Sequence, residues 1–331
     1  MNLQNRIDLL VQLGHYLQQN TPEWQETILK AGQKNPWFTP EFVQIATNHL
    51  VHEFLDKSKL EAWCRHYHLN DSIQPKNVGI VMAGNIPMVG FHDFLTVFIS
   101  GHHQKIKLSS KDDVLLPHCI QKLISWNKEV SQHVTIAEKL QDCDAFIATG
   151  SNNTSLYFEQ YFGKYPNIIR KNKTSVAVLN GDESKDELQA LSGDIHLYFG
   201  LGCRNITKIY VPEGYDFIPL LGAFENYAHL KDHHRYRNNY DYQLSVLLIN
   251  GIEYMTNGTT LLQQSPGMFS PIGIVHYEYY SNFDTLMDTL SKHEDLQCIA
   301  ANSATEWGKA QQPGLCDYAD GVDTMQFLLT I

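Results

Sequence analysis

The sequence lacks several patterns that would fix its class at once. No run of 18 apolar residues occurs among its 331 residues, so no membrane span is expected. The N-terminal stretch has neither the basic start nor the small-residue cleavage site of a signal peptide. Its six cysteines form no CxxC pair, which is typical of reduced thiols rather than of a disulfide framework. We therefore expect a cytoplasmic protein.

Positive charge is also scarce. The chain carries 25 Lys and Arg residues against 36 Asp and Glu residues, a formal net charge of -11. Proteins that bind nucleic acids concentrate basic residues on one face, and the two dense basic stretches here, 168–173 and 233–240, are short. A nucleic-acid partner is therefore not expected, although either stretch could meet a small anionic ligand.

The 16 histidines do not make a metal site by their number alone. The pairs at 102–103 and 233–234 are adjacent in sequence, and adjacent side chains diverge on both helices and strands. No Glu or Cys completes a set with the spacing of metal ligands. We predict no metal site.

Helix and strand signals are present and alternate after a helical start. "TPEW" (21–24) and "TPEF" (39–42) each offer a Thr N-cap followed by Pro, and the second predicts a long helix to about residue 69. From residue 76, short apolar runs alternate with helical stretches, which predicts βαβ crossovers and a mostly parallel sheet. The fold class is therefore predicted as α/β, with a domain boundary near Phe199. The predicted strands include 78–84, 105–110, 144–150, 174–181, 206–212, 272–280 and 297–302.

The ends of three predicted strands carry polar or glycine-rich bends: "GNIPM" (84–88), "KLSS" (107–110) and "TGSNNTS" (149–155). In open α/β sheets, ligands bind outside the carboxyl ends of the strands, so these bends are candidate binding positions. The dinucleotide fingerprint GxGxxG is absent, and each bend alone is a weak signal.

Cys203 stands between Gly202 and Arg204, in a bend ahead of a β-branched run. A reactive thiolate needs partial exposure and an electropositive environment, and Arg204 with the backbone dipoles of the turn could lower the pKa of this thiol. The alternative is a buried structural cysteine, which fits Cys119 and Cys298 better than Cys203.

Taken in order, Asn-x-Pro, Lys-x-Ser-Ser, Thr-Gly-Ser and Gly-x-x-Cys resemble the aldehyde dehydrogenase superfamily, and within it the acyl-CoA reductases of the LuxC type. The stretches 82–95, 199–217 and 309–328 carry most of the likeness, which covers about residues 76 to 328. The resemblance implies an aldehyde-dehydrogenase-like fold, with a Rossmann-type cofactor domain and an α/β catalytic domain. The expected parts are a helical N-terminal segment (1–75), a nicotinamide-cofactor domain (76–198), and a catalytic domain with the C-terminal tail (199–331).

The resemblance assigns two residues to the chemistry. Cys203 would be the nucleophile that takes up the acyl group. Asn85 would hold the developing oxyanion together with the backbone N–H of the cysteine. From the residues alone, Asn85 could equally form the turn before Pro87.

Four further residues would bind the cofactor. Lys107, assisted by Ser109, resembles the lysine that reaches the adenosine ribose or a 2′-phosphate, although Leu108 stands where many relatives have proline. Gly150 and Ser151 match the family's turn beside the nicotinamide and the pyrophosphate. The alternative readings are a solvated lysine for Lys107 and a helix N-cap for Ser151.

One departure from the family pattern bears on the reaction. Oxidising aldehyde dehydrogenases carry Glu-Leu-Gly-Gly-Lys where this sequence has "IRKNK" (169–173). That glutamate activates the water that hydrolyses the acyl-enzyme, so its absence favours a thioester reductase. Asp182 or Glu183 could stand in for it, but both also suit the start of the next helix.

The activity implied by the resemblance is reduction of an acyl thioester, here a fatty acyl-CoA, to an aldehyde by NADPH or NADH, in a homo-oligomer. Three alternatives remain open. The chain could run the same chemistry in the oxidative direction as a CoA-acylating aldehyde dehydrogenase. It could be a non-catalytic scaffold that binds a partner ligase or thioesterase. A cysteine hydrolase is disfavoured, because no histidine is obviously placed to serve the thiol.

Overall fold

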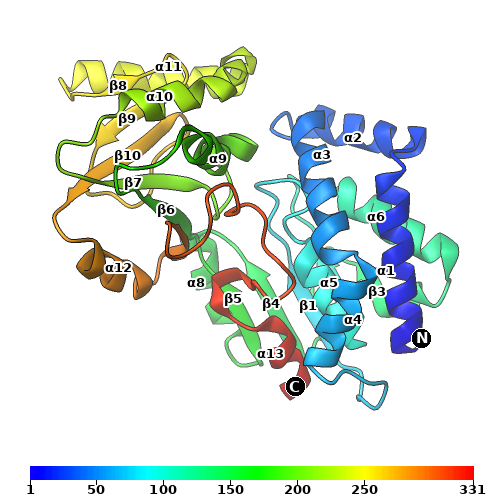
Figure 1. The fold of residues 1–331 in the computed structure, drawn as a ribbon. Coiled ribbons are helices and arrows are strands. Elements are labelled where there is room, and N and C mark those ends of the chain that lie inside the picture. Colours follow the sequence, from blue (N-terminus) through cyan, green and yellow to red (C-terminus); the bar gives the residue numbers. More distant parts are fainter. The chain divides into compact units, whose positions relative to one another are not determined.

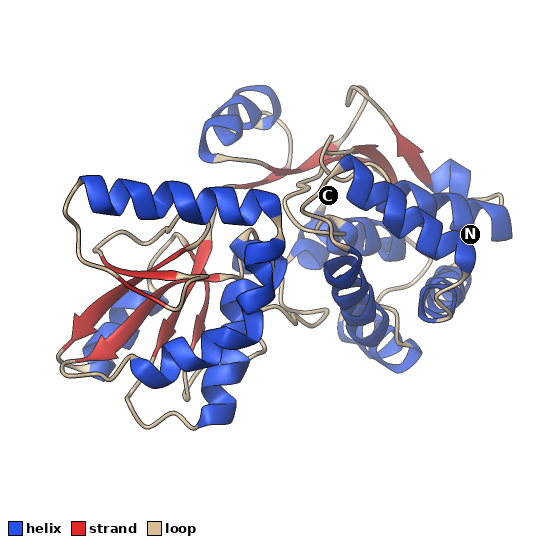
Figure 2. Cartoon of the chain, turned by 90° about the horizontal axis from the view of Figure 1, so that it is seen from above, coloured by secondary structure: helices blue, strands red, loops and turns tan.

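The computed structural model describes residues 1–331, and the chain forms two compact units (Figure 1). Unit 1 comprises Met1–Asn172 together with Pro313–Ile331, and unit 2 comprises Lys173–Gln312. In each unit the strands gather into one sheet that is flanked by helices (Figure 2). The fold class is α/β, as predicted. None of the helices is long and apolar enough to cross a membrane.

The sheet of unit 1 is parallel throughout, with the strand order β3-β2-β1-β4-β5. This is the strand order of a Rossmann-type sheet. Strands β2 and β3 are added on one side of β1, and β4 and β5 on the other, so the order reverses at β1. Val78, Ile80 and Ile147 are fully buried, as expected for strands covered on both faces. The strands are β1 (Asn77–Val81), β2 (His103–Lys107), β3 (Val134–Ile136), β4 (Ala145–Thr149) and β5 (Asn167–Arg170).

Four helices lie between these strands in the chain. Strand β2 follows helix α5. This helix ends at Gly101, which has the left-handed conformation (φ 92°) that is usual for a glycine C-cap. Helix α8 begins after Ser151, whose hydroxyl accepts a hydrogen bond from the backbone N–H of Thr154. The helices are α5 (Phe91–Ser100), α6 (Leu115–Trp126), α7 (Val130–His133) and α8 (Asn152–Phe162).

The N-terminal segment is helical. Thr21 and Thr39 cap the helices that they were predicted to start, each accepting a backbone N–H three residues on. The long helix predicted to about residue 69 is wrong. A π-helical turn (η1, Leu50–Phe54) interrupts it, and Asp56 caps a new helix. The helices are α1 (Leu3–Gln18), α2 (Pro22–Lys34), α3 (Pro40–His49) and α4 (Lys57–His66).

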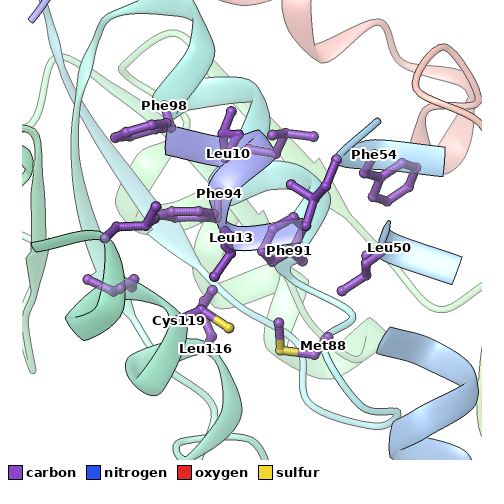
Figure 3. Close-up of a cluster of buried hydrophobic side chains, with 14 of the residues drawn as sticks. Leu10, Leu13, Leu50, Phe54, Met88, Phe91, Phe94, Phe98, Leu116 and Cys119 are labelled. Atoms are coloured by element: carbon purple, nitrogen blue, oxygen red, sulfur yellow. The ribbon is translucent and has the colours of Figure 1, made fainter. Parts of the chain in front are cut away.

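These N-terminal helices share one hydrophobic core with the five-stranded sheet of unit 1. Leu10 and Leu13 of α1 pack with Phe91, Phe94 and Phe98 of α5, all of them at most 1% exposed (Figure 3). Leu50 and Phe54 of the π-helical turn and Leu116 and Cys119 of α6 belong to the same cluster. Residues 1–75 are therefore an integral part of unit 1.

The C-terminal tail also belongs to unit 1, not to the catalytic part as predicted. Helix α13 (Thr324–Thr330) packs against α5, and the backbone carbonyl of Leu328 is 2.9 Å from Nε2 of His102. The indole N–H of Trp63 donates to the hydroxyl of Tyr318, which lies in the segment where the chain returns to unit 1. Just after Tyr318 lies a short 3₁₀ turn, η4 (Ala319–Gly321).

Unit 2 is built on a six-stranded sheet of order β11-β6-β7-β10-β9-β8, parallel except for the β8–β9 pair. Because β6 pairs with both β7 and β11, the segment that begins at Lys173 belongs here, and the boundary predicted near Phe199 is too late. The strands are β6 (Thr174–Val178), β7 (Ile206–Pro212), β8 (Met255–Thr256), β9 (Leu261–Gln264), β10 (Ile274–Tyr280) and β11 (Leu296–Ala300).

The helices of unit 2 follow its strands in the expected alternation. Ser184 opens α9 with a capping box, in which Glu187 returns the hydrogen bond to the N-cap. The elements are α9 (Lys185–His196), η2 (Leu197–Gly200), α10 (Ile218–Phe224), η3 (Glu225–Asp232), α11 (His234–Ile249) and α12 (Phe283–Ser291).

Candidate active site

The predicted cofactor residues meet at one edge of the sheet of unit 1. Val81 at the end of β1 pairs with Lys107 at the end of β2 and with Ala148 of β4. Because the strands are parallel, the bends that contain Asn85, Ser109 and Gly150 all leave from this carboxyl edge. β1 is also the strand at which the order reverses, where Rossmann-type sheets bind their ligands.

The bends after β1 and β2 are in direct contact. A Cβ atom placed on Gly84 would lie 2.6 Å from Oγ of Ser109, so only glycine permits this approach. The hydroxyl of Ser109 also accepts the backbone N–H of Lys111 at 3.3 Å. Ser109 thus shapes the edge by packing, while Lys107 beside it is exposed.

A buried carboxylate holds the bend that carries Asn85. The side chain of Asp112, 7% exposed, accepts the backbone N–H of Met88 at 2.9 Å. Met88 has a φ of 58°, in the left-handed region that a non-glycine residue adopts only when its surroundings enforce it. Burial raises the pKa of Asp112 to about 6. This contact between Asp112 and the bend after β1 is not visible in the sequence, where Asp112 has the pattern of an acid at the start of a helix.

Gly150 and Ser151 form the junction between β4 and α8. A Cβ on Gly150 would lie 2.8 Å from Cε2 of Phe158 and 3.0 Å from Cβ of Thr154, so the glycine lets the helix pack onto the strand end. Ser151 is the N-cap, with its hydroxyl 2.8 Å from that of Thr154. The alternative interpretation of Ser151 as an N-cap is therefore confirmed. Ser151 is also exposed at the carboxyl edge of the sheet.

The segment in place of Glu-Leu-Gly-Gly-Lys forms the end of β5. Arg170, 4% exposed, donates from Nη1 to both carboxylate oxygens of Asp93 at 2.8 and 2.7 Å, and from Nη2 to the hydroxyl of Thr324. The buried ion pair ties β5 to α5, and the hydrogen bond to Thr324 ties it to α13. Lys171 is exposed and pairs with Glu159 at 3.0 Å. The pattern "IRKNK" thus supplies structural cations.

Cys203 lies in unit 2, half-buried, in a turn at the amino edge of the sheet. Three consecutive residues before it, Tyr198, Phe199 and Gly200, have φ values of 55°, 58° and 73°. A left-handed conformation costs about 1–2 kcal/mol for each non-glycine residue. Tyr198 and Phe199 are both buried, so packing of their rings holds the backbone in this strained turn.

Two buried side chains bind the Cys203 turn itself. Oδ1 of Asn205 accepts the backbone N–H of Gly202 at 2.7 Å, and the hydroxyl of Ser175 donates to the backbone carbonyl of Cys203 at 3.0 Å. Asn205 and Ser175 are both fully buried. The turn is therefore held from two sides, by Asn205 just before β7 and by Ser175 near the start of β6.

A second cysteine lies next to this turn. Sγ of Cys298 on β11 is 3.0 Å from the hydroxyl of Ser175. Burial raises the pKa of Cys298, opposed by its hydrogen bond to Ser175 and by the nearby positive charge of Arg204. Arg204, which the sequence assigned to Cys203 alone, is thus also an electrostatic neighbour of Cys298.

The two acids that could replace the missing glutamate lie at the wrong edge. Glu183 follows the end of β6, whereas Cys203 precedes the start of β7, and the two strands are parallel. The carboxylate of Glu183 accepts the backbone N–H groups of Asn180 and Gly181, which shapes the turn into α9. Neither Asp182 nor Glu183 is therefore placed as a base for Cys203. An exposed acid, Asp295, does precede β11 at the same edge as Cys203.

Two histidines of unit 2 are engaged in structural contacts. His196, fully buried at the end of α9, lies 2.7 Å from the hydroxyl of Thr260 and 2.8 Å from the carbonyl of Ser192. Burial lowers its pKa to about 4, so it is neutral at physiological pH. The ring of His233 packs on Phe199, with 4.5 Å between centroids.

Comparison with known proteins identifies the fold. The sequence matches no protein-family model and no curated protein. Among solved structures, it matches the indole-3-acetaldehyde dehydrogenase AldA of P. syringae, in complex with NAD+ and IAA, with a TM-score of 0.67, 11% identity, and coverage of 91% of this chain and 72% of that one. The chain has the aldehyde dehydrogenase fold.

Two further structures agree. An NAD-dependent aldehyde dehydrogenase from Sinorhizobium meliloti matches with a TM-score of 0.64 and 10% identity, over 91% of this chain and 70% of that one. The aldehyde dehydrogenase KauB from Pseudomonas aeruginosa matches with a TM-score of 0.65 and 12% identity, over 91% of this chain and 72% of that one. The predicted fold is thus confirmed.

Proposed function

We propose that this protein is an acyl-thioester reductase that uses NADPH or NADH to convert a fatty acyl-CoA to an aldehyde, through a covalent thioester on Cys203. The observation that carries the proposal is the turn around Cys203: a half-buried thiol on a strained backbone, held by two fully buried side chains. Strain of this kind concentrates at functional sites.

Cys203 would act as the nucleophile. Its thiolate attacks the carbonyl carbon of the acyl-CoA, the carbon–sulfur bond to CoA breaks, and CoA leaves as a thiolate. Both sides of this exchange are thioesters, so the step needs no outside energy source. Asn85 is proposed as a donor to the developing oxyanion, a contact whose loss typically costs about 10²–10³ in rate.

The residues at the carboxyl edge of unit 1 fit a nicotinamide dinucleotide. Lys107 is exposed there, Ser151 opens an eleven-residue helix, and Gly84 and Gly150 let neighbouring segments approach closely. A reduced nicotinamide supplies a hydride, which reduces the thioester carbonyl. We propose Lys107, Ser109, Gly150 and Ser151 as the residues that bind the dinucleotide.

The missing base disfavours hydrolysis of the acyl-enzyme. After hydride addition, the tetrahedral oxyanion re-forms a carbonyl as the carbon–sulfur bond to Cys203 breaks, which releases the aldehyde and regenerates the thiolate. Hydrolysis of the acyl-enzyme would need a water activated by a base, and the segment before β6 supplies Arg170 and Lys171 instead of a glutamate. The intermediate can therefore persist until it is reduced.

The test is incubation with long-chain acyl-CoA and NADPH or NADH, following cofactor absorbance, free CoA and trapped aldehyde, beside Cys203→Ala. We expect stoichiometric CoA, aldehyde and oxidised cofactor, all abolished in the variant. Asp295→Asn is the companion variant, and it should retain activity because reduction requires no base for water. Size-exclusion chromatography of the same preparation tests the proposed homo-oligomer.

Other outcomes favour the alternatives. Turnover only with aldehyde, CoA and oxidised cofactor would identify a CoA-acylating dehydrogenase. Release of free fatty acid, lost in Asp295→Asn, would identify hydrolysis. If Cys203 is never acylated and no dinucleotide binds, the protein is a scaffold on the same fold.

A further inference from the structure

The Cys203 turn needs an external restraint. Gly202 donates its N–H to the side chain of Asn205, and the backbone N–H of Asn205 returns a bond to the carbonyl of Gly202 at 3.1 Å. Cys203 lies inside this closed loop of hydrogen bonds. Besides the bond from Ser175 to its carbonyl, the orientation of Cys203 therefore depends on what fixes Asn205.

Asn205 is fixed by the end of a helix. Its Nδ2 group donates to three backbone carbonyls where α9 terminates, those of Asp194, Ile195 and Leu197, at 3.0, 3.2 and 2.8 Å. A helix leaves its last carbonyls without internal partners, and here one buried amide meets three of them. The same side chain thus joins the end of α9 to the turn that carries the thiol.

The end of α9 is itself anchored. The carboxylate of Asp194, fully buried, accepts the backbone N–H groups of Gly308 and Ala310 at 2.7 and 3.1 Å. The strained residues Tyr198 and Phe199 span the short distance between α9 and the turn. Any shift of Asn205 would let these residues relax and would carry Cys203 with them.

We propose that Asn205 is the positioning residue for the nucleophile: it holds Cys203 at the angle and depth at which the thiol attacks. This inference rests on the proposed function of Cys203. Only a side chain with one acceptor and a two-hydrogen donor satisfies the contacts. Aspartate has the same shape but presents a second oxygen to three carbonyls, so it repels where asparagine binds.

The test uses Asn205→Asp in the full-length chain, with Asn250→Asp as the matched control. Asn250 is an exposed asparagine at the end of α11, and its Nδ2 donates to a single carbonyl, that of Val246. Two rates are measured: single-turnover release of CoA from an acyl-CoA, and alkylation of Cys203 by iodoacetamide, followed by mass spectrometry of its peptide.

We expect acyl transfer to fall about 10²-fold in Asn205→Asp, the typical cost of misplacing a reacting group by about 1 Å. The alkylation rate of Cys203 should change by several-fold, since the exposure of the thiol changes with the turn. NADPH affinity should stay within about two-fold, because the proposed cofactor residues belong to unit 1. Asn250→Asp should match the wild type in all three.

A lower melting temperature with unchanged acylation and alkylation of the folded variant would show that Asn205 is merely structural, and would overturn the inference. If the wild type is never acylated, the proposed function fails, while the alkylation rates still decide whether Asn205 positions the thiol. Should Asn205→Asp not fold, Asn205→Ser serves in the same assays, because it is neutral and keeps an acceptor.

Discussion

Two buried carboxyl groups should make the stability of this protein depend on pH. Burial raises the pKa of Asp194 to about 7 and that of Asp112 to about 6, from an ordinary value of 3.8. Between the ordinary and the raised pKa, the folded state holds a proton that the unfolded state has lost. The free energy of unfolding therefore falls as pH rises through each interval, by at most about 1.4 kcal/mol per pH unit for each group.

The two groups can be separated by their intervals. We expect Asp194→Asn to reduce the loss of stability between pH 6 and 7 by more than Asp112→Asn does, because Asp112 has already lost about half of its proton at pH 6. Urea unfolding of both variants at closely spaced pH values measures this. An identical slope above pH 6 in Asp194→Asn and the wild type would show that its carboxyl is not the source.

At the same scale, the sequence could indicate Cys203 but not the residues that hold it. A cysteine between glycine and arginine ahead of a β-branched run is visible as a pattern. Asn205 and Ser175 reach the turn through contacts that depend on where β6 and α9 lie, and no local spacing encodes them. The roles predicted for Asn85 and Lys107 remain predictions.

At the scale of elements, helix α8 depends on one glycine. In Gly150→Ala the new methyl group would lie 2.8 Å from the ring of Phe158 and 3.0 Å from Cβ of Thr154, so the first turns of α8 or the Phe158 ring must shift at the end of β4. We expect weaker binding of NADPH, at least ten-fold by fluorescence titration, with alkylation of Cys203 unchanged.

The matched control is Gly222→Ala in α10. An added Cβ there meets nothing within 4 Å, so the alanine should raise stability by about 0.5–1 kcal/mol through its better helix propensity. Equal cofactor affinity in Gly150→Ala and the wild type would contradict the assignment of this junction to the dinucleotide.

The sequence predicted helices and strands correctly where a short stretch of neighbouring residues determines them. The run 206–212 is a strand with those bounds, and the left-handed Gly101 ends its helix. Strand β5 (Asn167–Arg170) was not predicted, because its sequence NIIR contains only two apolar residues between polar ones. The π-helical turn at Leu50–Phe54 was also missed, since a continuous apolar face does not reveal a change in hydrogen-bond spacing.

At the scale of the whole molecule, unit 2 is one continuous segment inserted into unit 1. The predicted boundary failed because the sheet that a strand joins is decided by partners far along the chain. β6 pairs with β11, and the tail after Pro313 returns to the first unit. Local periodicity is the same in either sheet.

We therefore expect residues 173–312 to fold when expressed alone, with a single cooperative thermal transition by circular dichroism. A chain that lacks residues 313–331 should show a destabilised unit 1, because Met325 and Leu328 leave the core and Arg170 loses Thr324. The transition of unit 2 should be unchanged in that truncated chain. A segment 173–312 without a cooperative transition would refute the division.

The inserted arrangement also orders events during synthesis. The ribosome must complete all of unit 2 before it produces the helix that closes unit 1. At about 5–20 residues per second, that interval is on the order of ten seconds. During it, the apolar surface that α13 later covers on α5 stays open while the neighbouring unit is already able to fold. Nascent chains of this protein should therefore be most exposed to chaperones late in translation, through the unit that was begun first.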